Sequence, residues 1–162
     1  MTPWLVIGYG NTLRGDDGAG PEVARVVAEW GLPGVRALAV HQLTPELAPE
    51  VASAARVVFV DASIDPPNGA IELRLLGPKA AVGSLGHISD PQTLLKLAHE
   101  VYGGCPDAWL VTIPANCVEF GEGFSTAAQR GINDALTRIE RWLQEPLDEP
   151  ARGGGSGAEA PS

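Results

Sequence analysis

Residues 8–20, GYGNTLRGDDGAG, join an apolar run at 4–8, WLVIG, to the segment 21–30, PEVARVVAEW. Apolar side chains in the second segment recur at the spacing of one helix face, at Val23, Val26, Val27 and Trp30. Pro21 suits the first turn of such a helix because its missing N–H has no partner there. The stretch therefore predicts a strand, a glycine-rich turn with two adjacent carboxylates, and a helix.

The alternation of strand and helix continues along the chain. Apolar runs at 35–40, 56–61 and 108–113 predict further strands, and 71–76 predicts a fifth. The runs around Val6, Phe59 and Val111 are apolar throughout, which is typical of strands covered on both faces of a mainly parallel sheet.

Three more helices are predicted by their start signals. Thr44 before Pro45 opens one through Ser53, and Asp90 before Pro91 opens another through Tyr102. The last runs from about Ser125 to Leu143, with a core face of Ala128, Ile132, Leu136 and Ile139. We expect an α/β fold of three layers, in which a twisted, mainly parallel sheet of about five strands carries helices on both faces.

The chain of 162 residues is long enough for one domain, predicted at residues 1–143. Residues 144–162 are rich in Gly, Pro, Ala and Glu and predict a disordered tail. The net charge of −9 argues against a nucleic-acid partner. The N-terminus has neither the basic start of a signal peptide nor an apolar run long enough to span a membrane, so we expect a cytoplasmic protein.

The glycine-rich loop does not fit a phosphate site. A dinucleotide fingerprint would need a third glycine where Leu13 stands, and the Walker lysine is absent. Asp16 and Asp17 would repel a phosphate placed beside them. We therefore expect no nucleotide cofactor and consider a cation instead.

Asp61 ends the run RVVFVD, so it is predicted at the same rim of the sheet as the glycine loop. His87, in a loop before the helix that opens at Asp90, adds an imidazole, and one His with two carboxylates suits a divalent transition metal. Purely structural roles are also open for these residues. In them, Asp16 or Asp17 caps the helix near Gly18, Asp61 caps a turn, and His87 is a solvated loop residue. His41 follows the second predicted strand and is a further neighbour of the rim.

Nucleophilic catalysis has no support in the residue pattern. Cys105 and Cys117 lack a CxxC spacing and are expected to be ordinary buried or partly buried thiols. Ser84 and Ser89 flank His87 too closely to define a triad.

An ordered series of segments resembles the hydrogenase maturation proteases, the endopeptidases that trim the C-terminus of the nickel-containing hydrogenase large subunit. The resemblance covers about residues 4–143. Its segments are GYGNTLRGDDGAG, PEVARVVAEW, HQLTPEL at 41–47, VVFVDAS at 57–63, GHISDPQTLL at 86–95 and VEFGEGFS at 118–125.

The resemblance implies a metal-contacting set of Asp17, Asp61 and His87, with Asp16 aligned to the acid that precedes the loop ligand. Some relatives carry Glu where Asp17 stands, so the ligand here is one methylene shorter. The resemblance further implies that the nickel is supplied by the substrate, the precursor of the hydrogenase large subunit, and that the enzyme reads this metal before it cuts. Asp16 and Asp17 are the candidates for proton transfer. We expect a monomer, since no coiled-coil pattern is present.

Two other classes share these acids. A signalling receiver domain also places two acids after its first strand and one after its third, but it needs a lysine after its last strand, where this chain reads PANCVEFGEGFS. A nickel-binding maturation chaperone that does not cut would use the same three ligands. Such carriers often have His-rich tracts, whereas this chain has three scattered His.

Overall fold

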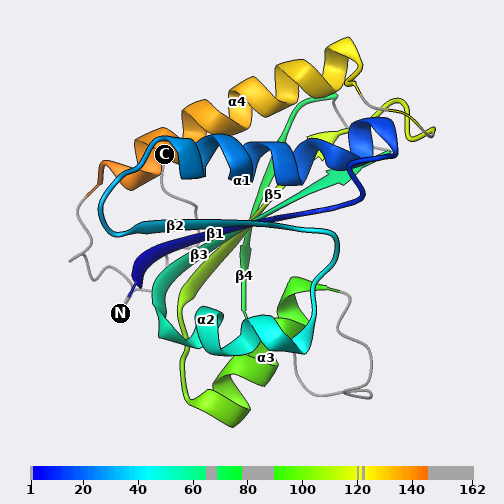
Figure 1. The fold of residues 1–162 in the computed structure, drawn as a ribbon. Coiled ribbons are helices and arrows are strands. Elements are labelled where there is room, and N and C mark those ends of the chain that lie inside the picture. Colours follow the sequence, from blue (N-terminus) through cyan, green and yellow to red (C-terminus); the bar gives the residue numbers. More distant parts are fainter. Residues whose placement is uncertain (1, 65–68, 78–89, 120, 122, 146–162) are drawn as a thin grey trace.

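Figure 1 shows the computed structural model, which describes residues 2–64, 69–77, 90–119, 121 and 123–145. The strands are β1 (Thr2–Tyr9), β2 (Val35–Val40), β3 (Ala54–Ser63), β4 (Glu72–Leu76) and β5 (Asp107–Pro114). The helices are α1 (Ala19–Glu29), α2 (Ala48–Ser53), α3 (Pro91–Tyr102) and α4 (Thr126–Leu143), with short 3-10 helices η1 (Gly15–Gly18) and η2 (Pro45–Leu47).

The five strands form one sheet in the order β2-β1-β3-β5-β4. Neighbouring strands are parallel except at the β4 edge, where β4 runs antiparallel to β5. In the register of β1 and β3, Gly8 lies opposite Val60, so the chain leaves β1 beside the residue that precedes Asp61. The first strand and the third strand therefore end at the same rim.

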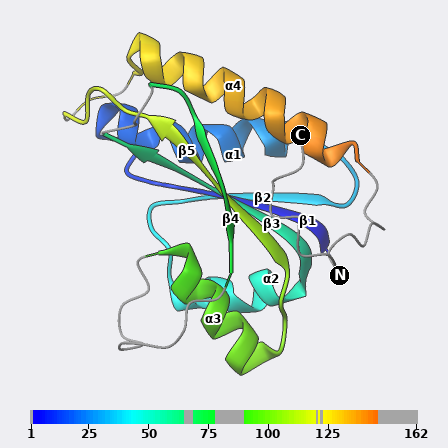
Figure 2. The ribbon, with the colours of Figure 1, turned by 180° about the vertical axis from the view of Figure 1, so that it is seen from behind.

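Helices cover both faces of the sheet, which confirms the predicted three-layer α/β fold. In Figures 1 and 2, α1 and α4 lie on one face, and α2 and α3 lie on the other. No helix in the described part of the chain is long and apolar enough to cross a bilayer.

The central strands face two cores because their side chains alternate between the faces. In β1, Trp4 and Val6 pack with Val27 of α1, whereas Leu5 and Ile7 pack with Leu94 of α3. β3 alternates in the same way. This two-sided burial explains why β1 and β3 are apolar throughout.

The predicted elements agree with the structure, including the fifth strand. Asp90 caps α3 by accepting a hydrogen bond from the Thr93 N–H at 2.8 Å, and Ser125 caps α4 by accepting one from the Ala128 N–H at 3.1 Å. The prediction of buried or partly buried cysteines is wrong, since Cys105 and Cys117 are both exposed on loops outside the two cores. The tail at 146–162, the end of the predicted 144–162 segment, lies outside the described residues.

Candidate functional site

The glycines of the loop after β1 allow close backbone approach. A Cβ at Gly8 would overlap the carbonyl oxygen of Gly20, and a Cβ at Gly20 would overlap the carbonyl oxygen of Val60. α1 can therefore begin directly against β1 and β3. The glycines bring the loop to the strand ends, which is a packing role that requires no phosphate.

Asp16 is the buried anchor of this loop, with no exposed surface. Its carboxylate accepts hydrogen bonds from the backbone N–H of Asn116 at 2.7 Å and of Cys117 at 3.0 Å. It also accepts from the N–H and the hydroxyl of Ser125, at 2.7 and 2.6 Å. Burial by itself would raise the pKa of Asp16, but the bonds from Ser125, Cys117 and Asn116 outweigh it and lower the pKa below its ordinary value.

Backbone hydrogen bonds extend this link. The Asp16 N–H donates to Cys117 at 2.7 Å, the Gly15 N–H donates to Gly121 at 2.8 Å, and the Gly121 N–H donates to Leu13 at 2.7 Å. The described part of the segment after β5 is thereby docked on the glycine loop. The alternative that Asp16 or Asp17 caps the helix near Gly18 is wrong, because no side-chain cap bond is present at the start of η1 or α1.

Asp17 is held differently from its neighbour. Its Oδ2 accepts a hydrogen bond from the Asn11 N–H at 2.7 Å, and within the described residues no hydrogen bond to its Oδ1 is found. The side chain is partly exposed. One oxygen of Asp17 is therefore fixed by the loop, and none of the described residues hydrogen-bonds the other.

Asp61 stands at the end of β3 and is mostly buried. Its Oδ1 accepts a hydrogen bond from the Ala62 N–H at 2.7 Å. Burial raises the pKa of Asp61 to about 6, against the opposing effect of hydrogen bonds from Ala62 and the Tyr9 hydroxyl, and the charge of Asp17 raises it further. The negative charge of Asp17 thus acts on Asp61 across the rim.

Tyr9, the last residue of β1, completes this side of the rim. Burial raises the pKa of its hydroxyl above the ordinary range, and the Asp61 charge, the hydrogen bond to Asp61 and the Asp90 charge act in the same direction. Arg74 of β4 opposes them. The charged groups that act on Tyr9 therefore come from β3, β4 and the start of α3.

His87 lies outside the described residues, so the structure does not test the predicted set of Asp17, Asp61 and His87. Within the described part of the chain, no group of three or more His, Cys, Asp or Glu side chains that could hold a metal ion is found. His41 follows β2 and is exposed. The metal set and the catalytic roles of Asp16 and Asp17 stay predictions.

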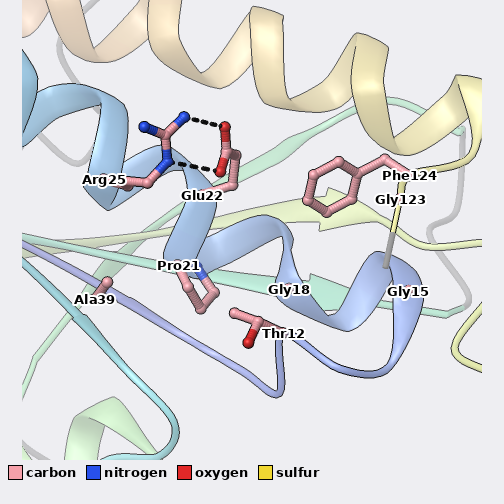
Figure 3. Close-up of a pocket in the computed structure, with 9 residues that line it drawn as sticks. All are labelled: Thr12, Gly15, Gly18, Pro21, Glu22, Arg25, Ala39, Gly123 and Phe124. Carbon is pink, nitrogen blue, oxygen red and sulfur yellow. Dashed lines mark hydrogen bonds and ion pairs between the residues drawn. The ribbon is translucent and has the colours of Figure 1, made fainter. Parts of the chain in front are cut away.

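A pocket of about 390 Å³ lies against the same loop, at the start of α1. Gly15 and Gly18 belong to its lining, together with Pro21, Thr12 and Phe124. Figure 3 shows Phe124 extending from the segment after β5 toward α1, with the paired side chains of Glu22 and Arg25 on the helix.

Two contributors to the site were missed by sequence reasoning. Ser125 was predicted only as a helix start, and its partner Asp16 is 109 residues away, a separation at which no local pattern operates. Tyr9 was counted as part of the glycine loop. The usable signal was its position at the end of the first predicted strand, at the rim where Asp61 is also predicted.

The fold matches solved structures of hydrogenase maturation enzymes. The NiFe hydrogenase maturation protease HycI from Thermococcus kodakarensis KOD1 has a TM-score of 0.69 and 23% identity over 89% of this chain and 94% of its own. The hydrogenase 2 maturation peptidase from Thaumarchaeota archaeon SCGC_AB-539-E09 has 0.65 and 24%, over 87% and 97%. The hydrogenase maturating endopeptidase HybD from E. coli has 0.66 and 18%, over 87% and 91%.

No protein-family model and no curated protein matches the sequence. The structural matches nevertheless cover 87–89% of this chain and 91–97% of each solved protein. At these identities the likeness concerns the arrangement of strands and helices. This chain therefore has the fold of the hydrogenase maturation proteases.

Proposed function

We propose that this chain is an endopeptidase that removes the C-terminal peptide from the nickel-loaded precursor of the NiFe-hydrogenase large subunit, with the nickel as recognition element. The observation that carries the proposal is the pair of Asp17 and Asp61, whose carboxylates interact across the rim between the ends of β1 and β3. The shared fold with named maturation proteases supports it.

The two carboxylates suit a cation that arrives with the substrate. The charge of Asp17 contributes to a raised pKa of Asp61, and a bound divalent ion would replace this repulsion with attraction. Each side chain already has one oxygen held by a backbone N–H, Asn11 for Asp17 and Ala62 for Asp61. Such bonds orient the carboxylates before the ion arrives, which lowers the entropy cost of binding.

Nickel is the ion this donor set suits when the substrate completes it. His87 is the predicted third donor from this chain, and precursor thiolates would supply the rest, since nickel accepts imidazole, carboxylate and thiolate ligands. A precursor without nickel would leave the negative charges of Asp17 and Asp61 without a cation to neutralise them. Cleavage would therefore depend on metal loading.

Proton transfer falls to Asp17 in this proposal. Its Oδ1 has no hydrogen bond among the described residues, whereas the Asp16 carboxylate is buried and accepts four. We assign Asp16 the role of a positioning residue that holds the segment after β5 against the glycine loop. The substrate's nickel would polarise the scissile carbonyl or activate the attacking water, and Asp17 would take a proton from that water and return it to the leaving amine as the peptide bond breaks.

The strand order weighs against the receiver alternative. Receiver domains are parallel throughout with the strand order 2-1-3-4-5. Here the sheet ends in the edge strand β4, which runs antiparallel to its neighbour β5. The non-cutting nickel chaperone would use the same carboxylates, so an activity measurement must separate it from the protease.

The test is a cleavage assay followed by mass spectrometry, with nickel-loaded and nickel-free precursor of the hydrogenase large subunit. We expect a C-terminal peptide to be released from loaded precursor only. Asp17→Asn and Asp61→Asn should each reduce the rate about 100-fold or more. Asp134→Asn, which removes an exposed acid of α4, is the matched control and should stay within about twofold.

Each other outcome has a defined meaning. Folded wild type that binds the loaded precursor without cutting it would favour the chaperone. Equal cleavage of loaded and nickel-free precursor would refute the nickel-reading step while leaving a protease.

A further inference from the structure

The pocket beside η1 has the character of a site for an uncharged side chain. Phe124, Pro21 and the methyl groups of Ala39 and Thr12 supply apolar lining, and glycines supply the remainder near the loop. A volume of about 390 Å³ is larger than a large aromatic side chain requires. The pocket therefore has room for one such side chain and part of its backbone.

The charged groups at this pocket are already paired. The Arg25 guanidinium contacts Glu22 at 2.7 Å and Glu29 at 2.6 Å, as Figure 3 shows for Glu22. A ligand carboxylate would have to compete with two glutamates for this arginine, and a ligand ammonium would have to compete with this arginine for the glutamates. An apolar side chain would leave the ion pairs of Arg25 with Glu22 and Glu29 intact.

The edge of the sheet leads into the same pocket. β2 pairs with β1 alone, so within the described residues its outer edge has no strand partner. Ala39, which lines the pocket, belongs to β2. Open strand edges bind extended peptides through backbone hydrogen bonds, with pockets for alternate side chains.

The pocket adjoins the loop that carries the candidate catalytic acids. Gly15 and Gly18 line the pocket and enclose Asp16 and Asp17 in the sequence, and Phe124 directly precedes Ser125, which is bonded to Asp16. A peptide held in the pocket would lie next to the loop that carries Asp17.

We propose that this pocket binds an apolar side chain of the precursor, in an extended segment near the scissile bond that lies along the open edge of β2. The proposal rests on the proposed function, because it names the substrate contact of that same activity. It assigns Phe124 and Ala39 to substrate binding and leaves the chemistry to Asp17 and Asp61.

The test uses one variant that empties the pocket and one that fills it. Phe124→Ala and Ala39→Phe should each raise KM for nickel-loaded precursor about tenfold with kcat within about twofold. Phe124→Leu, which keeps an apolar side chain, should fall between wild type and Phe124→Ala. The matched controls are Tyr102→Ala, an exposed aromatic on α3, and Ala28→Phe, an exposed alanine on α1 outside the pocket lining. Both should leave KM unchanged.

The outcomes separate the two proposals. If wild type cleaves loaded precursor and the folded pocket variants keep the wild-type KM, the pocket assignment is refuted while the protease stands. If kcat falls at constant KM, the pocket acts on the chemical step and the assignment is also refuted. If folded wild type does not cleave, the protease proposal fails first.

A second copy of the chain is the rival occupant. Sedimentation of wild type and Ala39→Phe tests it without any substrate. A wild-type dimer that Ala39→Phe converts to a monomer would overturn the substrate assignment, and monomers in both cases would support it.

Discussion

Asp16 and Asp17 are neighbours in the chain, yet the structure uses them in opposite ways. The Asp16 carboxylate is buried and saturated with donors, whereas Asp17 keeps one oxygen without a bond among the described residues. Buried carboxylates with several N–H donors are stabilised in the charged form. Adjacent identical side chains can therefore serve as anchor and as reactive group.

Asp61 makes the stability of the folded protein depend on pH, with a sign that follows from its raised pKa. Its pKa rises from 3.8 unfolded to about 6 folded, so ionisation disfavours the folded state. Its contribution to the free energy of unfolding is fully present below pH 4 and is lost as the pH rises through 6. At 1.36 kcal/mol per pKa unit, the loss amounts to about 1 to 3 kcal/mol. Asp61→Asn should remove this loss and make the protein more stable than wild type at pH 7. Urea unfolding at pH 4, 5, 6 and 7 measures it.

The control is again Asp134→Asn, which should follow the wild-type pH profile. Asp16 has the opposite sign, because its folded pKa is lowered, and its stabilisation should disappear as pH falls below about 4. Parallel profiles for wild type and Asp61→Asn would contradict the burial of Asp61. A variant that gains stability and loses cleavage would mark Asp61 as a functional rather than a structural acid.

The contact of α1 with β1 and β3 depends on two glycines. Gly20→Ala would push a Cβ into the backbone carbonyl of Val60 and close to the backbone oxygen and nitrogen of Tyr9. Backbone cannot move aside as a side chain can, so we expect a loss of about 2 to 4 kcal/mol in the free energy of unfolding. Gly77→Ala is the control, since its Cβ would meet nothing within 4 Å and its φ is not positive.

Chemical denaturation of both variants decides this prediction. A cost below about 1 kcal/mol for Gly20→Ala would mean that α1 shifts easily, and the close approach would not be what the glycines provide.

The elements themselves were predictable because their signals are local. The continuous apolar runs of β1 and β3 indicate that both of their faces are buried. Asp90 and Ser125 cap helices through partners only three residues away. The rim position of Asp61 followed from its place at the end of an apolar strand in a mainly parallel sheet. What could not be predicted is which acid of the pair Asp16 and Asp17 is buried, because the donors to Asp16 come from residues 116–125.

Near its C-terminal end, the described chain is anchored in the core by Trp142. Trp142 is fully buried in the core under α4, at 5.6 Å from the ring of Trp109, and the described chain ends three residues later. Deletion of residues 146–162 should leave the melting temperature within about 1 °C, as the composition of that segment indicates. Deletion from Arg141 onward removes Trp142 and should lower it by about 6 °C or more.

Differential scanning calorimetry of the two truncations checks this expectation. A large shift for the shorter deletion would show that the tail packs on the domain. An unchanged temperature for the longer one would mean that Trp142 adds little to the core.

The bonds from Asn116, Cys117 and Ser125 to Asp16 also set an order of events during synthesis. The glycine loop leaves the ribosome early, but its anchor needs a segment about 100 residues further along. Contacts of such long sequence separation form late in folding, since their loop-closure entropy must be overcome first. We therefore expect a nascent chain to form β1, α1 and β3 before it can fix Asp16 in its buried place. The glycine loop gains its anchor only when residues 116–125 have been made, so a chain that stops before them would carry Asp16 without its hydrogen-bond donors.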